Sequence, residues 1–429
     1  MHFAIQRPSI LIPQLLFLLT LLLYPRLARG ADPESCIKIL NDSLIEFYLP
    51  SVDAQHGGYL EVLDEAGKFE ASDKFLTLQA RQLWFFSTLA INDIRKQESL
   101  AAAKSGFEFL TSKFFDDAHG GYFAKVSATG EPVDTRKHVY PNAFVIYGLV
   151  EYYRATQDPD ALRKAVDLFN TLEKHCYDQE HGGYREFFYA DWKLITDPAE
   201  SGYVGAINTK TYNSHLHILE AFAQLYRETQ EPTLQSRLNE LININTETVK
   251  HPSFPCNIDG WYTDWQMIET PRNLRASYGH DVECAWLVMD AVEALGEKYE
   301  QSEKITEWAI GICEFAIKHG LDTKHGGFFS SGIPNQVSDD RRKIWWVQSE
   351  ALVAMLTLHK MTGDDRYREI FDSCYDFTVN HHIAPQGGWW DTLEEDGTVG
   401  QKKTRTSMWQ GAYHNGRALL HCAKLLERS

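Results

Sequence analysis

The sequence lacks any closely spaced pair of cysteines. Its seven cysteines are scattered, and no C-x-x-C pattern or zinc-binding Cys/His spacing occurs. This absence excludes dithiol and zinc-finger motifs. In an oxidising compartment some thiols could pair, and the odd number leaves at least one free. Four lie in apolar helical patterns, where we expect buried free thiols: Cys284, Cys313, Cys374 and Cys422.

Positive charge is also scarce. The chain has 42 lysines and arginines against 59 aspartates and glutamates, a net charge of −17. Such a surface repels phosphate backbones and anionic lipid headgroups. We therefore expect neither nucleic acid nor a membrane surface as a partner.

Long hydrophobic runs are nearly absent. The apolar run Leu15–Leu23 is too short to span a bilayer. A basic residue precedes it and small residues follow it up to Gly30, a pattern typical of a secretory signal peptide. We expect residues 1–30 to be removed and the protein to be secreted or periplasmic, with an uncleaved anchor as the alternative. No linker or low-complexity tract interrupts residues 31–429, which we expect to form one catalytic domain.

A Gly-Gly-aromatic signature recurs at intervals of about 60 to 75 residues. Each interval has room for two helices of about 12 to 16 residues and a long loop. Six helical hairpins predict an all-α fold, the (α/α)6 barrel, in which six inner helices surround one pocket. The signature occurs at Gly57-Gly58-Tyr59, Gly120-Gly121-Tyr122, Gly182-Gly183-Tyr184, Gly326-Gly327-Phe328 and Gly387-Gly388-Trp389, with a degenerate copy at Asp259-Gly260-Trp261.

Polar and aromatic residues follow each turn, near the expected start of each inner helix. On a ring these starts converge, so we expect their side chains to share one cavity. The segments are Gln79–Phe85, Lys137–Phe144, Asn213–Glu220, Gly279–Glu283, Trp345–Glu350 and Trp409–Arg417.

Three histidines occupy equivalent places in these segments: His217, His280 and His414. An imidazole can take and return a proton near neutral pH, and a carboxylate one turn away can fix its tautomer. Nearby glutamates could instead serve as helix caps. We interpret His215 as a packing residue, and the histidines that precede the turns as turn-stabilising: His56, His119, His181 and His325.

The ordered motifs resemble those of the N-acylglucosamine 2-epimerase superfamily and, within it, the cellobiose 2-epimerases. The resemblance covers essentially the whole chain after residue 30. It rests on Gln-Ala-Arg-x-Leu-Trp, Asn-x-His-Leu-His-x-x-Glu-Ala, Gly-His-Asp-x-Glu, Lys-x-Trp-Trp-x-Gln-x-Glu and Tyr-His-Asn-Gly-Arg. It implies an (α/α)6 barrel that needs no cofactor and epimerises C2 of the reducing-end sugar of a β-1,4-linked disaccharide of the cellobiose, mannobiose or lactose type.

Carried over by motif, the resemblance implies a catalytic group of His217, His280, His414 and Arg81. It implies that His280 and His414 exchange the C2 proton and that His217 supports ring opening. A cation such as Arg81 suits the developing enediolate oxygen. We expect a disaccharide as partner, a monomer and no bound metal. The expected substrate-binding residues are Tyr140, Asn213, Glu283, Trp346, Glu350 and Trp409.

Rival interpretations remain open. A monosaccharide 2-epimerase or aldose–ketose isomerase of the same superfamily would share these motifs. A metal-dependent isomerase could use His217, His280 and Glu283 as ligands. A non-catalytic sugar-binding protein would need the tryptophans but not three histidines. An (α/α)6 glycoside hydrolase would need two carboxylates, available among Asp281, Glu283, Glu350 and Asp391.

Overall fold

The computed structural model describes residues 31–200, 202–400 and 403–427, and residues 31–429 form one compact unit. The expected signal peptide, residues 1–30, lies outside the described residues. In the described part, no helix combines the length and apolar character needed to cross a membrane. All seven cysteines are buried and unpaired, as predicted for the four in apolar helical patterns.

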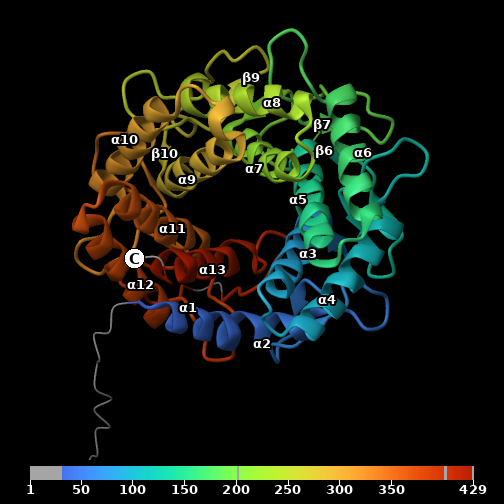
Figure 1. Ribbon diagram of the computed structural model, residues 1–429, viewed down its shortest axis with the longest axis horizontal. Coiled ribbons are helices and arrows are strands. Elements are labelled where there is room, and N and C mark those ends of the chain that lie inside the picture. Colours follow the sequence, from blue (N-terminus) through green and yellow to red (C-terminus); the bar gives the residue numbers. More distant parts are fainter. Residues whose placement is uncertain (1–30, 201, 401–402, 428–429) are drawn as a thin grey trace, which may run out of the picture. The chain divides into compact units, whose positions relative to one another are not determined.

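Six helices form a closed inner ring, in which each packs on the next and the last packs on the first (Figure 1). Most of their positions are buried on all sides because outer helices cover one face and ring neighbours cover the others. The inner helices are α3 (Leu76–Ile91), α5 (Val139–Thr156), α7 (Tyr212–Thr229), α9 (Tyr278–Leu295), α11 (Trp345–Thr362) and α13 (Tyr413–Glu427).

A second set of helices packs around this ring, each against the inner helix of its own hairpin. Acidic caps and proline begin several of them; Asp158, for example, accepts the N–H of Asp160, with Pro159 in the first turn. The outer helices are α4 (Lys96–Phe109), α6 (Pro159–His175), α8 (Pro232–Asn243), α10 (Ser302–Gly320) and α12 (Asp365–His381), together with α1 (Pro33–Ile39), which continues through a π-helical segment (Leu40–Ile45) into α2 (Glu46–Tyr48).

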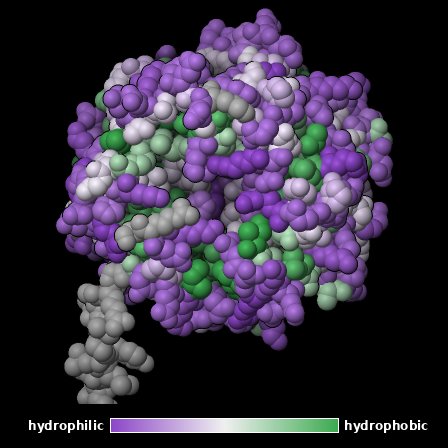
Figure 2. Space-filling view, in the orientation of Figure 1, coloured by the Kyte–Doolittle hydropathy of each residue, from purple (hydrophilic) through white to green (hydrophobic). Residues whose placement is uncertain are grey.

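The two ends of the described chain close the ring, because the first outer helix, α1, packs on the last inner helix, α13. The fold is therefore the predicted (α/α)6 barrel. Figure 2, in the same view, shows a mostly hydrophilic face with a hollow near the centre of the ring.

Short antiparallel strand pairs join consecutive repeats. In five pairs, a strand that leads into one inner helix bonds to a strand from the next repeat: β3–β4, β6–β7, β8–β9, β10–β11 and β12–β13. The strands are β1 (Val62–Leu63), β2 (Phe69–Glu70), β3 (Lys74–Phe75), β4 (Lys125–Val126), β5 (Pro132–Asp134), β6 (Lys137–His138), β7 (Phe187–Phe188), β8 (Thr209–Thr211), β9 (Gly260–Tyr262), β10 (Ala276–Ser277), β11 (Ser331–Gly332), β12 (Lys343–Ile344) and β13 (Thr392–Leu393).

The Gly-Gly turns hold each loop against the start of an inner helix. Gly58 has φ +69°, and a Cβ there would lie 2.6 Å from Gln79 Oε1. Gln79 Oε1 accepts the N–H of Tyr59 at 2.9 Å. Four other inner helices supply the same kind of acceptor, from Asn142, His215, Asp281 and Gln348. The structural role predicted for His215 is therefore confirmed.

The fourth turn differs from its predicted position. The N–H of His251 bonds to the carbonyl of Cys256, as that of Asp53 bonds to Gly58 in the first repeat. Pro255-Cys256 thus stands where other repeats have Gly-Gly. The prediction of a degenerate copy at Asp259-Gly260-Trp261 is therefore wrong, because that segment lies four residues after the turn. Gly260 and Trp261 belong instead to β9.

Candidate active site

A cavity of about 430 Å³ lies where the inner helices begin. Nine of the ten residues predicted for the site line it, and the tenth, Glu350, is fully buried behind them. The predicted lining residues are Arg81, Tyr140, Asn213, His217, His280, Glu283, Trp346, Trp409 and His414.

His217, on α7, is paired with a carboxylate one turn further along the same helix. Its Nδ1 lies 3.0 Å from Glu220 Oε2. Burial alone would raise the pKa of Glu220, but the Arg417 charge and hydrogen bonds from His217 and Tyr413 lower it to about 2. An ionised carboxylate only accepts, so Nδ1–H is the donor and Nε2 is the nitrogen left to take a proton.

His414, on α13, has the same arrangement with a carboxylate from α11. Its Nδ1 lies 2.6 Å from Glu350 Oε1. Both oxygens of Glu350 already receive N–H donors, Oε1 from Arg417 at 2.8 Å and Oε2 from Trp286 at 3.0 Å. Glu350 therefore acts as an acceptor at both oxygens, which makes His414 Nδ1 a donor and leaves Nε2 free for chemistry.

Burial keeps both imidazoles neutral at ordinary pH. It lowers the pKa of His217 to about 4, even though Glu220 opposes the shift. It also lowers the pKa of His414 far below its usual value, and the positive charges of Arg81 and Arg417 act in the same direction. Neutral imidazoles held by carboxylates are suited to accept protons.

His280, on α9, is held differently. Its Nδ1 lies 2.9 Å from the hydroxyl of Ser277, the residue before the helix. Burial lowers the pKa of His280, opposed by the negative charges of Asp259 and Glu350. The indole of Trp346 contacts His280 and His414, with ring centroids 4.6 and 5.7 Å away. Trp346 thus links the two histidines along the cavity wall.

Arg81, on α3, is fixed by one side chain and one backbone carbonyl. It donates to the Tyr140 hydroxyl at 2.6 Å and to the carbonyl oxygen of Trp409 at 3.0 Å. Its guanidinium lies over the Phe144 and Tyr413 rings, 4.2 and 4.8 Å from their centroids. A cation held this firmly is preorganised to meet negative charge that develops on a ligand.

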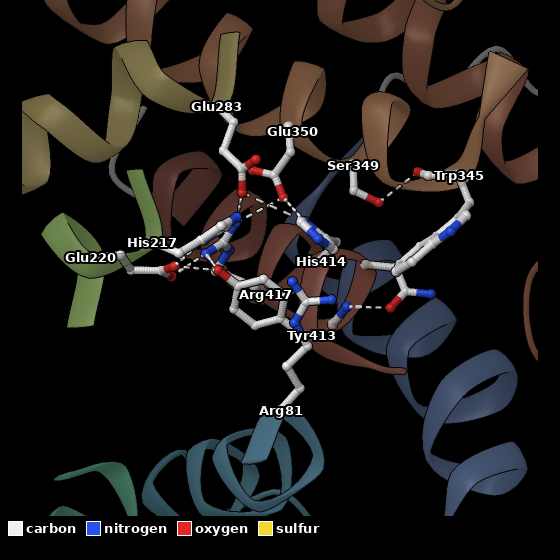
Figure 3. A network of polar contacts seen from close by, with 12 residues as sticks. Arg81, His217, Glu220, Glu283, Trp345, Ser349, Glu350, Tyr413, His414 and Arg417 are labelled. Carbon is white, nitrogen blue, oxygen red and sulfur yellow. Dashed lines mark hydrogen bonds and ion pairs between the residues drawn. The ribbon is translucent and has the colours of Figure 1, made fainter. Parts of the chain in front are cut away.

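Behind the histidines, three buried carboxylates converge on one guanidinium (Figure 3). Arg417 donates to Glu220, Glu283 and Glu350, the last two at 2.8 Å. Burial and the neighbouring charge of Glu350 raise the pKa of Glu283 well above its usual value. Glu283 Oε2 has no hydrogen-bond partner among the described residues, so it is the oxygen of this cluster best placed to carry a proton.

The carboxylates and imidazole of Glu283, Glu350 and His414 lie close enough together to hold a metal ion. The Arg417 guanidinium already supplies a cation to both carboxylates. The ligand set of the metal-dependent rival, which combines His217 and His280 with Glu283, is not among the clusters of ligand atoms in the described residues. The set of Glu283, Glu350 and His414 is therefore better matched to the Arg417 guanidinium than to a divalent ion.

Most of the carboxylates that a glycoside hydrolase mechanism would need here are not free to act on a sugar in the cavity. Asp281 is buried outside the cavity lining, where its Oδ1 accepts the N–H of Asn257, and Glu350 lies behind the wall. Glu283 and Asp391 line the cavity, but Glu283 is held by Arg417.

The sequence analysis gave no site role to Arg417, Tyr203 or Asp259, and it named Asp391 only as a carboxylate for a hydrolase. Arg417 was part of a quoted motif, and its position three residues after His414 places it on the same face of α13. Tyr203, Asp259 and Asp391 also line the cavity. These three lie in loops, where no helical spacing signals which way a side chain points.

Trp409 precedes α13 in a non-helical segment and is 37% exposed. Its ring packs near Tyr203 and Tyr140, with centroids 5.1 and 6.2 Å apart. It therefore forms an exposed part of the cavity wall.

The chain is similar over most of its length to known sugar epimerases. It is 31% identical to a cellobiose 2-epimerase of Dictyoglomus turgidum and 32% identical to one of Bacteroides fragilis, covering 90% and 87% of this chain and 96% and 93% of those proteins. A solved cellobiose 2-epimerase from Bacillus thermoamylovorans superposes with a TM-score of 0.83 at 30% identity, covering 92% of this chain and 99% of that one. The protein is a carbohydrate epimerase, an isomerase. The family profile named N-acylglucosamine 2-epimerase matches residues 57–417, and the chain belongs to that family.

Proposed function

We propose that the protein epimerises C2 of the reducing-end sugar of a β-1,4-linked disaccharide by proton transfer between histidines. One observation carries the proposal. Two neutral imidazoles, His217 and His414, are each held through Nδ1 by a carboxylate, and they line the same cavity as a third, His280.

The reaction begins with ring opening. A base takes the proton of the O1 hydroxyl, the C1–O5 bond breaks to leave an aldehyde, and an acid protonates O5. The ring centroids of His217 and His414 lie 6.5 Å apart on the cavity wall, a separation suited to groups that act on neighbouring oxygens of one sugar. We assign ring opening to this pair.

The aldehyde makes the C2 proton acidic. His280 or His414 removes that proton, and its electron pair moves through C1 to O1, giving an enediolate. The other histidine, in its protonated form, then gives its proton to the opposite face of C2, so the two histidines exchange protonation states. Trp346, which contacts both imidazoles, is placed to hold the flat intermediate between them.

Negative charge on the enediolate needs a fixed partner. Arg81 is held by Tyr140 and the Trp409 carbonyl, and we assign it this role. We assign sugar-hydroxyl contacts to Asn213, whose buried Oδ1 has no hydrogen-bond partner in the part of the chain that the structure describes.

Two features support a disaccharide substrate. The relatives described above are named cellobiose 2-epimerases. The exposed ring of Trp409 offers a surface beyond the histidines for a second, non-reacting sugar. Binding energy from that sugar can orient the reacting one.

The test is C2 proton exchange in D2O, followed by NMR with cellobiose, mannobiose, lactose, glucose and mannose. We expect deuterium at C2 of the reducing-end sugar of a disaccharide, together with the C2 epimer. Exclusive conversion of a monosaccharide would shift the assignment to a monosaccharide epimerase or isomerase. Release of free sugar from the disaccharide would favour a hydrolase.

A further inference from the structure

One buried side chain, Arg417, connects the carboxylates that hold two of the histidines. Its Nη1 donates to Glu220, the partner of His217. Its Nη2 donates to Glu283 and Glu350, which lie 3.6 and 2.6 Å from the Nδ1 of His414. The three carboxylates come from three different inner helices, α7, α9 and α11. No other described residue bonds to all three.

The geometry uses properties that only arginine has. A guanidinium presents donors in a rigid planar fork, so its two terminal nitrogens can serve carboxylates on two sides at once. Arg417 is 1% exposed, and its guanidinium lies over the Trp286 and Tyr413 rings, 4.6 and 4.2 Å from their centroids. Buried ion pairs are often no more stabilising than apolar packing, so stability alone is a weak reason for this arrangement.

We propose that Arg417 is the positioning residue shared by both histidine–glutamate pairs, and that through it the two imidazoles are coupled so that one is neutral when the other is protonated. The proposal rests on the proposed function above for its role in the reaction, but the coupling itself is a property of the free protein.

Ring opening uses this relation. One neutral imidazole takes the O1–H proton, the C1–O5 bond breaks, and the imidazolium so formed gives its proton to O5, so the net charge of the pair is unchanged. The other imidazole stays neutral meanwhile, because the neighbouring positive charge disfavours its protonation.

The charges around the pair set the signs of the expected shifts. The positive charge of Arg417 lowers the pKa of both histidines, and that of His217 also lowers the pKa of His414. The negative charge of Glu220 raises the pKa of His414, although the two do not touch. The titratable groups facing the pair are Arg81 on α3, Tyr140 and Tyr147 on α5, Glu220 on α7, Glu283 on α9, Glu350 on α11, and Tyr413 and Arg417 on α13.

The first test needs no variant and no turnover. In the histidine-labelled full-length protein, ¹⁵N NMR should show His217 and His414 as neutral Nδ1–H tautomers at pH 7. An Nε2–H tautomer for either would overturn the proposal. Because this result does not depend on activity, it is separate from any failure of the proposed epimerisation.

The second test compares Arg417→Met, Arg417→Lys and the control Arg227→Met, which removes a partly exposed arginine paired with Asp290. Losing the positive charge should raise the histidine pKa values, so the acidic limb of kcat/KM in Arg417→Met should move up by about one pH unit or more. Arg417→Lys keeps the positive charge but loses the planar guanidinium that bridges the carboxylates. Its acidic limb of kcat/KM should therefore stay at the wild-type pH, while kcat falls at least about 10-fold. The control should resemble wild type. An unmoved limb in folded Arg417→Met would contradict the proposal.

A further variant covers the case in which Arg417→Met does not fold. The substitution Glu220→Gln leaves Arg417 in place, and the side chain at position 220 is not a contact partner of His414. It removes a negative charge, so NMR titration should show His414 protonating at lower pH than in wild type. An unchanged His414 titration would show that the two pairs are not coupled.

Discussion

Trp409→Ala should separate disaccharide from monosaccharide turnover. The Trp409 ring is 37% exposed, whereas the histidines beside it are largely covered. An aromatic side chain can bury about 150 to 250 Å², so roughly 55 to 90 Å² of Trp409 remains for a second sugar. At about 25 cal/mol per Å², that contact is worth about 1.4 to 2.3 kcal/mol. We therefore expect kcat/KM for cellobiose to fall about 10- to 50-fold.

The slow reaction of free glucose or mannose should be nearly unchanged, because a single sugar at the histidines does not reach the exposed face. The Arg81 contact should also survive, since it is made to the backbone carbonyl of Trp409. The assay is steady-state kcat/KM for cellobiose, glucose and mannose.

Tyr262→Ala is the matched control. Tyr262 is an aromatic residue of β9 that is 52% exposed and does not line the cavity. If Trp409→Ala reduced monosaccharide and disaccharide turnover equally, Trp409 would not mark a second sugar site, and the assignment would return to a monosaccharide enzyme.

Three further predictions follow from the buried histidines, the cation at Arg417 and the N-terminal sequence. Burial lowers the pKa of His215 to about 3 and that of His217 to about 4, so unfolding takes up protons below about pH 6.5. The melting temperature should therefore fall as the pH drops from 6.5 towards 4. A melting temperature that does not change with pH in this range would contradict these buried environments. Because Arg417 supplies the cation between the carboxylates, activity should survive exhaustive EDTA treatment, and a loss restored by Mn²⁺ or Co²⁺ would revive the metal-dependent rival. N-terminal sequencing of native material should begin at Ala31, whereas intact Met1 in a cytosolic fraction would refute export.

The ring was predictable because its repeat is marked by residues with a strict backbone requirement. Gly58 and its equivalents adopt positive φ and leave no space for a Cβ, so the turns keep glycine while the helices between them vary. The fourth turn could not be located in this way, because it has no glycine pair. Pro255-Cys256 makes the same loop contact without a glycine pair, as the hydrogen bond from His251 to Cys256 and the bridge between Lys250 and Asn257 show.

The site was predictable where residues follow helical spacing. His217 and Glu220 are three residues apart on one helix, so their contact could be expected from the sequence. The partner of His414 could not, because Glu350 lies 64 residues earlier and meets it only when α11 and α13 pack together. The bridging role of Arg417 depends in the same way on three helices at once.

In the proposed reaction His280 and His414 exchange the C2 proton, and deuterium incorporation by their alanine variants tests this exchange most directly. In D2O with the preferred disaccharide, His280→Ala and His414→Ala should each lower the rate of C2 exchange at least about 100-fold with the fold intact. His359→Ala, which removes a histidine near the far end of α11, should exchange like wild type. Near-normal exchange in either of the first two variants would contradict the two-base account.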